Sequence, residues 1–265
     1  SSVTDMAGMF RMASAFNQPI GNWERTGSTV GNVTDMNEMF GSATSFNQDL
    51  SSWDVSSVTN MYSMFNNATS YTNQGNPLDW GAAVGSVTNM FRMFWGSAFN
   101  QDISNWDVSS VTDMGLMFYG NSSFNQDISG WDVSSVTEMN SMFENATSFD
   151  QDLGSWNITS VTDMSEMFKG VTLSTANYSS ILTGWESQSV QSGVIFHGGS
   201  SNYYSGSPAT ARQSLIDNDS WTITDGGEVT SEMTLVFNTN NVSGTKTIEL
   251  PLFDNVDVTV DWGDG

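Results

Sequence analysis

The sequence contains no cysteine, and it has only six lysines and arginines against 29 aspartates and glutamates in 265 residues. The absence of cysteine excludes disulfides, thiolate metal sites and cysteine nucleophiles together. The formal net charge of −23 argues against nucleic acid or an anionic membrane surface as a partner. The chain also lacks an apolar run long enough to span a bilayer, so we expect no membrane insertion.

What the chain does contain is a repeated string with the signature V-T-x-M. Seven copies begin at Val3, Val33, Val58, Val87, Val111, Val136 and Val161, at steps of 30, 25, 29, 24, 25 and 25 residues. A fixed period of this size indicates stacked repeat units, and the two long steps are insertions that map to loops. No signal peptide is visible, and the sequence begins inside a repeat, so we expect the natural N-terminus to precede it.

The apolar spacing changes halfway through each copy. In residues 136–143 the apolar positions fall at i, i+3, i+6 and i+7, which predicts a short helix or 3₁₀ turn. Residues 124–128 alternate with period two, which predicts a strand with Phe124 and Ile128 inward and Asn125 and Asp127 outward. The predicted fold class is an α/β solenoid, a leucine-rich-repeat-like coil of either hand. It has one parallel β-sheet, short helices or 3₁₀ turns opposite, and a C-terminal α/β cap.

The repeat pattern F-N-Q-D-[IL]-S-x-W-D-V-S-x-V-T-x-M-x-x-M-F-x-x-A resembles that of BspA-like bacterial surface proteins, an irregular branch of the leucine-rich-repeat class. The resemblance covers residues 1 to about 170. It implies an extracellular solenoid used for adhesion or protein contact, with no catalytic residues. The first copy departs from the pattern at Gln18 and Pro19, and the third near Tyr71, so we expect any ladder along the stack to break there.

Three domains are predicted from the change in period. Residues 1–171 form the repeat solenoid, residues 172–229 its C-terminal cap, and residues 230–265 the truncated start of a PKD-like β-sandwich that continues into further domains of the same chain. The elements expected in the cap are helices at 174–182 and 208–217 and strands at 193–197 and 221–224.

Two files of acidic residues are expected on the outer face. One consists of Asp49, Asp102, Asp127 and Asp152, and the other of Asp54, Asp107, Asp132 and Asn157. Neighbours in adjacent coils would lie about 4.8 Å apart, and Ca²⁺ could relieve their repulsion. The preferred interpretation is a solvated ladder in which Asn side chains bond along the stack, and the seven aspartates are the candidate calcium ligands of the alternative. The candidate partner-binding residues are Asn47, Asn100, Asn125 and Asp150.

Repeated acids also raise the possibility of a glycosidase. That interpretation is disfavoured because an active site is one asymmetric constellation, whereas these acids recur along an open face with nothing to separate their pKa values. His197, the single histidine, is expected to be a structural residue at a strand end. We therefore predict that the chain is not an enzyme.

An exposed tryptophan track would instead indicate a carbohydrate-binding module. The repeated tryptophans are Trp23, Trp53, Trp106, Trp131 and Trp156. Trp53, Trp106 and Trp131 each share their parity with a valine two residues later, and Trp156 with Ile158, so a buried stack is expected. The threonine file of Thr59, Thr112, Thr137 and Thr162 is too narrow for ice binding.

The sequence therefore predicts an extracellular or cell-surface module for adhesion or protein recognition over an extended acidic face. Its partner would be a protein or glycan on another cell or host surface. A carbohydrate-binding module and a passive spacer in a large surface protein remain the alternatives.

Overall fold

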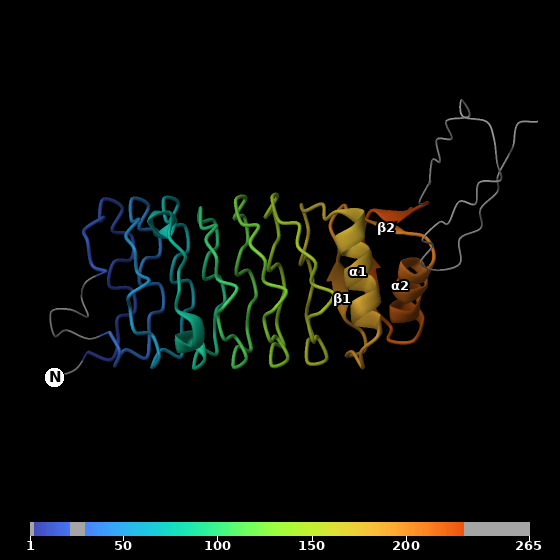
Figure 1. The fold of residues 1–265 in the computed structure, drawn as a ribbon, viewed down its shortest axis with the longest axis horizontal. Coiled ribbons are helices and arrows are strands. Elements are labelled where there is room, and N and C mark those ends of the chain that lie inside the picture. Colours follow the sequence, from blue (N-terminus) through green and yellow to red (C-terminus); the bar gives the residue numbers. More distant parts are fainter. Residues whose placement is uncertain (1–2, 22–29, 231–265) are drawn as a thin grey trace, which may run out of the picture.

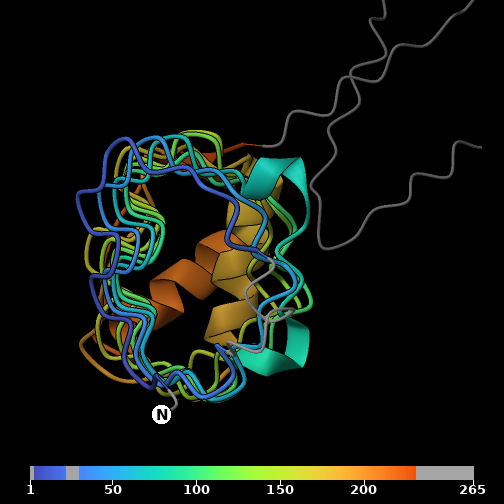
Figure 2. The ribbon, with the colours of Figure 1, turned by 90° about the vertical axis from the view of Figure 1, so that its left-hand side faces the viewer.

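The described part of the chain is a row of similar turns that ends in a helical segment. A computed structural model describes residues 3–21 and 30–230. Figure 1 shows the repeats side by side along the long axis, with α1 (Thr175–Glu186) and α2 (Ser207–Asp217) near the C-terminal end. In the view along that axis, the traces of successive repeats nearly overlie one another (Figure 2).

Regular secondary structure is scarce in these residues, and the predicted fold class is wrong. Besides α1 and α2, the elements are η2 (Asn73–Gly75), η3 (Gly81–Val84), β1 (Ile195–His197), β2 (Asn202–Tyr204), β3 (Thr222–Thr224) and β4 (Gly227–Val229). The strands form two small parallel sheets, β1 with β3 and β2 with β4. The expected solenoid coil, with one parallel sheet and short helices opposite, is not found, and the described repeats are mainly irregular.

Residues 136–143, predicted as a short helix, instead form turns that bond to the next repeat. Alternate N–H groups donate to backbone oxygens of that repeat: Met139 to Asp163 at 2.9 Å, Ser141 to Ser165 at 2.8 Å and Phe143 to Met167 at 3.0 Å. Ser141 has a φ of +52°, a left-handed conformation that interrupts an α-helix. The bridges assigned to these residues are isolated and parallel, and both involve Glu138, which pairs with Asp113 of the preceding repeat and with Asp163 of the next. Apolar spacing suggested a helix, but the hydrogen bonds run between repeats.

Residues 124–128, predicted as a strand, have the expected alternation without strand pairing. Phe124 and Ile128 are buried, whereas Asn125 and Asp127 are exposed. The N–H of Asn125 donates to the side-chain Oδ1 of Asn100 at 2.9 Å rather than to a backbone oxygen. Alternation thus predicted the orientation of the side chains correctly. It did not predict that side-chain oxygens, rather than backbone oxygens, accept the N–H groups of the next repeat.

The interior of the stack consists of columns of aromatic rings. Phe118 lies 3.8 Å from Phe124 within its repeat and 5.6 Å from Phe143 of the next, measured between ring centroids. Trp131 is 3% exposed, and its Nε1–H donates to the oxygen of Ile103 in the preceding repeat at 3.1 Å. The indole is therefore packed and its one donor is satisfied, as a buried tryptophan requires.

The C-terminal elements follow the sequence prediction closely. Both helices and the two predicted strands, β1 and β3, are present, and β2 and β4 were not predicted. Phe196 in β1 forms a bridge with Met164 of the last repeat, and Phe168 donates its N–H to His197 at 3.0 Å. The last repeat thus pairs with β1. The three-domain division stays a prediction, and residues 231–265 of the predicted PKD-like domain lie outside the described residues.

A buried ion pair joins the elements of this C-terminal segment. Arg212 on α2 donates through Nε to Oδ2 of the nearly buried Asp225 at 2.7 Å. The hydroxyl of Tyr178 on α1 donates to the same oxygen at 2.8 Å. Burial raises the pKa of Tyr178, so its hydroxyl stays protonated and remains a donor. A buried carboxylate is tolerated here because it is both paired and hydrogen-bonded.

Candidate binding surfaces

One surface of the stack is held together by asparagine side chains, and we call it the Asn surface. Its members are Asn17, Asn47, Asn100, Asn125 and Asp150. Asn125 shows the arrangement: its Oδ1 accepts from the backbone N–H of Asp150 at 2.9 Å and from Nε2 of Gln151 at 2.7 Å. Each side-chain oxygen thus replaces a backbone acceptor for the next repeat. The four residues predicted to contact a partner all belong to this ladder.

The Asn surface consists of two runs. The first passes from Asn17 through Asn47 to Thr72, and the second from Asn100 through Asn125 and Asp150 to Ser174. The interval between the runs coincides with the third copy, whose departure from the pattern predicted a break. The first copy also departs from the pattern, yet Asn17 still accepts the N–H of Asn47 at 2.9 Å.

The predicted acidic files consist of aspartates that bond within their own turns. Oδ1 accepts the N–H two residues later at 2.8–3.1 Å in Asp49, Asp54, Asp102, Asp107, Asp127, Asp132 and Asp152. Asn157 forms the same turn with Thr159. Hydrogen bonds from Ser129 and Ser134 lower the pKa values of Asp127 and Asp132, so both are charged at neutral pH. These acids stabilise turns and add negative charge to the surface.

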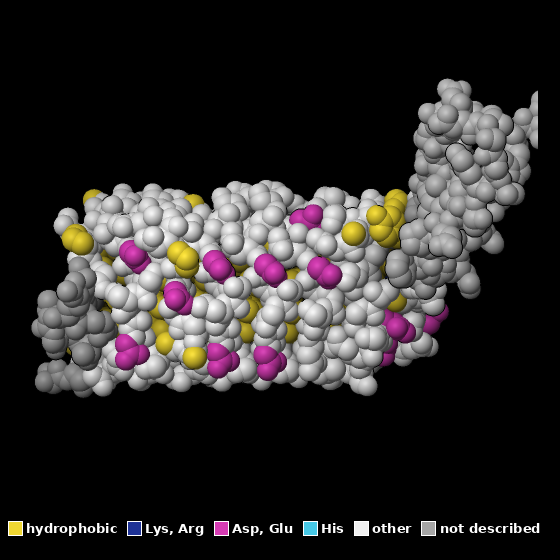
Figure 3. All heavy atoms as spheres, in the orientation of Figure 1, with side chains coloured by type: hydrophobic (Ala, Val, Ile, Leu, Met, Phe, Trp, Pro, Cys, Tyr) yellow, Lys and Arg dark blue, Asp and Glu magenta, His cyan; other side chains and the backbone are white. Residues whose placement is uncertain are grey.

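The described residues contain no preformed cluster in which these acids could bind Ca²⁺. Figure 3 shows separate acidic side chains on the face in view. Among residues 3–21 and 30–230, no group of three or more His, Cys, Asp or Glu side chains is placed to hold a metal ion. Ca²⁺ prefers six to eight oxygen ligands around one point. Calcium binding by the seven aspartates therefore stays a prediction from the sequence.

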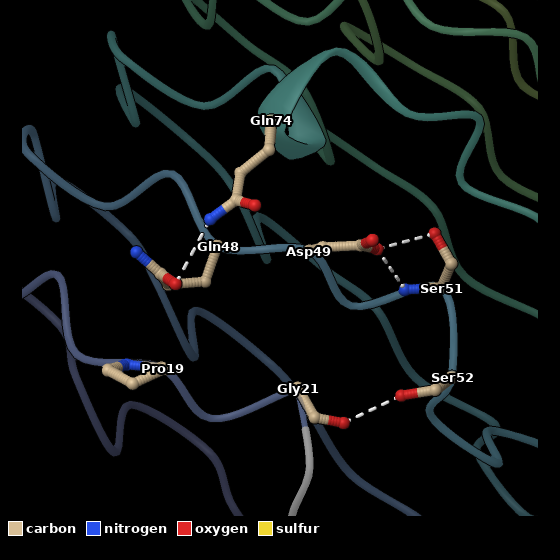
Figure 4. A pocket seen from close by; sticks show the side chains of 7 residues that line it. All are labelled: Pro19, Gly21, Gln48, Asp49, Ser51, Ser52 and Gln74. Carbon is tan, nitrogen blue, oxygen red and sulfur yellow. Dashed lines mark hydrogen bonds between the residues drawn. The ribbon is translucent and has the colours of Figure 1, made fainter.

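A hollow of about 420 Å³ lies beside Asp49 (Figure 4). Ser51 donates through its N–H and its hydroxyl to Asp49, Gln74 donates to Gln48, and Ser52 donates to the oxygen of Gly21. These polar groups are thus hydrogen-bonded to one another or to the backbone around the hollow. The described part of the hollow is a polar depression on the surface.

The other sequence candidates prove to be structural. Trp53, Trp106, Trp131 and Trp156 are at most 3% exposed, which confirms the buried stack, and Trp23 lies outside the described residues. His197 ends β1, as predicted, and its Nδ1 accepts the N–H of Gly199 at 3.0 Å. Hydroxyls of the threonine file donate to backbone oxygens of the preceding repeat, as Thr137 does to Thr112 at 3.2 Å.

A second surface, which sequence reasoning missed, is formed by the M-x-x-M-F-x turns, and we call it the turn surface. After the first Met, repeats two to seven have Asn37, Tyr62, Phe91, Gly115, Asn140 and Ser165. After the Phe, they have Gly41, Asn66, Trp95, Tyr119, Glu144 and Lys169. The repeats thus differ at these positions while the core residues between them recur. Aligning the copies by their Met and Phe residues would have revealed this contrast.

Comparison with known proteins identifies a family. A family model described as Mycoplasma protein of unknown function, DUF285, matches residues 1–83 and again residues 79–185. No curated protein and no solved structure matches the chain. In the part of the chain that the structure describes, no helix has both the length and the apolar character needed to cross a membrane.

Proposed function

We propose that this chain, which belongs to the DUF285 family of Mycoplasma proteins of unknown function, is a non-enzymatic recognition module of an extracellular bacterial surface protein. It would bind a protein partner through an extended acidic repeat surface. The family match supports the repeat and surface-protein part of the proposal. The resemblance of its motif to BspA-like repeats supports a role in adhesion.

The observation that most supports recognition is the repetition of outward polar groups on a regular support. Consecutive repeats are joined by backbone hydrogen bonds of 2.6–3.4 Å and by the aromatic columns, so outward groups recur at regular intervals. Such a surface suits many weak contacts spread over a large area. Catalysis would instead require one pocket with unlike groups.

The charge of the chain favours a partner with a basic surface. The net charge is −23, and three of the four described Lys and Arg residues are already paired with carboxylates. Complementary charge accelerates association and is screened by salt over about 8 Å at physiological ionic strength. Binding should therefore weaken as the salt concentration rises.

A binding screen tests the proposal directly. The full chain would be immobilised and exposed to purified extracellular-matrix proteins and to a glycan array, in millimolar calcium and in a chelator. We expect saturable binding to at least one protein, with an affinity that falls when sodium chloride is raised from 50 to 500 mM. The matched control is the heat-denatured chain, which has the same composition and charge.

Each outcome of the screen has a stated meaning. Binding to glycans alone would favour the carbohydrate-binding alternative. Absence of binding to either class would favour a passive spacer and contradict the proposal. Equal binding and equal melting temperature in calcium and in chelator would dismiss the calcium prediction, because a ligand of the folded state must stabilise it.

A further inference from the structure

Five side chains of the turn surface form a contiguous cluster that we call the aromatic island: Tyr62, Phe91, Arg92, Trp95 and Tyr119. All five are partly exposed. The rings of Tyr62 and Phe91 stack at 5.5 Å, and those of Trp95 and Tyr119 lie 5.8 Å apart. The guanidinium carbon of Arg92 lies 5.1 Å from the Phe91 centroid and 5.9 Å from that of Trp95. Arg92 thus joins the two ring pairs into one surface.

Packing between repeats does not require these side chains. Two repeats later, Asn140 and Glu144 occupy the positions of Phe91 and Trp95. The backbone hydrogen bonds to the next repeat are nevertheless formed in the same way. Large aromatic side chains left partly in water lose the benefit of burial, and clusters of them mark interaction sites. The island therefore indicates a contact with another molecule.

Arg92 differs from the other cations that the structure describes. Arg11, Lys169 and Arg212 each form an ion pair with a carboxylate, whereas Arg92 contacts aromatic rings instead. The residues at its position in the adjacent repeats are Ser63 and Leu116, which are uncharged. Its charge is therefore available to a carboxylate of a partner, even though the chain itself is strongly acidic.

The orientation of the rings favours a protein over a sugar. Tyr62 and Phe91 are nearly parallel, at 14°, so one face of each is covered by the other. Gly115 packs close to the Phe91 ring, because a Cβ placed at Gly115 would be 3.0 Å from the ring carbons Cδ2 and Cε2. A sugar ring stacks on an open aromatic face, whereas ring edges suit apolar and aromatic side chains. Tyr, Trp and Arg are also the residues most enriched at the energetic centres of protein interfaces.

We propose that the aromatic island is the site at which this module contacts its protein partner. The partner places an apolar or aromatic side chain against the ring edges, and a neighbouring Asp or Glu carboxylate of the partner pairs with Arg92. This inference rests on the proposed function and specifies its site. It places recognition on the turn surface rather than on Asn47, Asn100, Asn125 and Asp150, the contact residues expected from the sequence.

The test uses a library of random 12-residue peptides displayed on phage and selected on the full chain. We expect enrichment of peptides with an aromatic or aliphatic residue close to Asp or Glu. The affinity of a synthetic selected peptide, measured by fluorescence anisotropy, should fall at least about tenfold with Trp95→Ala and with Arg92→Gln. Thermal melting of each variant checks that it remains folded.

Matched variants distinguish binding at the island from nonspecific binding to exposed aromatic or cationic residues elsewhere. Tyr204 is an exposed aromatic residue outside the island, at 39% exposure, and Arg11 is an arginine already paired with Glu38 at 2.6 Å. Tyr204→Ala and Arg11→Gln should leave the affinity unchanged within about twofold, as expected for residues outside the energetic centre of an interface. Replacing the peptide's acid by its amide should remove the effect of Arg92→Gln, which is the signature of a direct pair.

Several results would overturn the inference. If peptide affinity is unchanged by Trp95→Ala but is lost with Asn125→Ala, the site lies on the Asn surface and the proposed function still holds. Glycan binding, or a dimer of this chain in sedimentation, that Trp95→Ala abolishes would assign the island to another occupant. If no peptide or protein binds any surface, the island and the proposed function both fail.

Discussion

The Asn surface and the turn surface belong to the same repeats, yet the repeats agree on the first and differ on the second. On the Asn surface the bond to the next repeat is made by a side chain, as from Asp150 N–H to Asn125 Oδ1 at 2.9 Å. On the turn surface it is made by backbone atoms, as from Phe143 N–H to the Met167 oxygen at 3.0 Å. Side-chain pairing restricts residue identity, whereas backbone pairing leaves it free to vary.

This difference separates stability from recognition within one repeat unit. A substitution on the Asn surface should remove a bond between repeats, and a substitution of an outward residue on the turn surface should not. The interior supports both surfaces equally. The following predictions test the comparison, from the largest expected effect to the smallest.

The interior should show the largest loss of stability. Trp131→Ala removes a buried indole and its hydrogen bond to Ile103, and it should lower the free energy of unfolding by about 3 to 5 kcal/mol. Trp95→Ala is the control, because the same change on the turn surface removes a partly exposed ring and should have a smaller effect. Urea denaturation followed by circular dichroism measures both. A near-neutral Trp131→Ala would revive the sugar-platform interpretation.

The left-handed turns should show the next largest effect. Gly120 on the turn side has a φ of +65°, and a Cβ added there would meet no heavy atom within 4 Å. Gly120→Ala should therefore cost about 1 to 2 kcal/mol through backbone conformation alone. Gly130→Ala is the matched control, since Gly130 is equally open but is not left-handed, and it should be neutral or slightly stabilising. Equal effects in thermal melting would contradict this account of the turns.

Asn125 tests the side-chain ladder of the Asn surface. Asn125→Ala leaves the N–H of Asp150 without its acceptor, and it should reduce the free energy of unfolding by about 1 kcal/mol. Asn140→Ala is the control on the turn surface, where the backbone oxygen of Asn140 accepts the Leu116 N–H at 2.9 Å and survives the change. Chemical denaturation of the two variants gives the comparison. Equal losses would show that the two surfaces do not differ in this way.

The sequence predicted which residues lie inside, because period-two alternation and recurring Trp, Met and Phe residues report burial. Phe124, Ile128 and Trp131 are all buried as expected. It did not predict the backbone conformation of residues 136–143. Apolar spacing at i, i+3 and i+7 is compatible with a helix and also with a turn that contains a residue in the left-handed conformation. Ser141 at φ +52° shows this, since serine is not specific for that conformation. The C-terminal helices were predictable because each has local start signals, such as Pro208 in the first turn of α2.

The candidate site was predicted less well than the core. Asn125 and Asp127 were correctly placed outward, and the preferred interpretation, Asn side chains that bond along the stack, is confirmed by the bond from Gln151 Nε2 to Asn125 Oδ1. The same Asn side chains were also named as candidates for partner contact. A polar residue that recurs in every copy is ambiguous between function and stacking. Residues such as Trp95, which interrupt the pattern, are not needed for stacking and are better indicators of contact.

The smallest expected effect is the pH dependence of individual carboxylates. Hydrogen bonds from Ser134, the side-chain bond first, lower the pKa of Asp132 below its ordinary value of 3.8. The resulting stability is present above the pKa of the unfolded chain and is lost as the pH falls through the folded pKa. Asp113, on the turn side, has its pKa raised by burial, so its ionisation costs stability at neutral pH, and that cost is relieved as the pH falls through its folded pKa.

Carboxyl-carbon NMR titration can test these two opposite signs in one sample. We expect Asp113 to titrate above pH 3.8, and Asp127 and Asp132 below it. Ser134→Ala should move the midpoint of Asp132 back toward 3.8, because the side-chain donor is the largest cause of its shift. Ser129→Ala is the matched control, since it removes a donor to Asp127 and should leave Asp132 unchanged. If Asp113 were to titrate below Asp132, burial would not be the dominant influence on the turn side, and the electrostatic part of the comparison would fail.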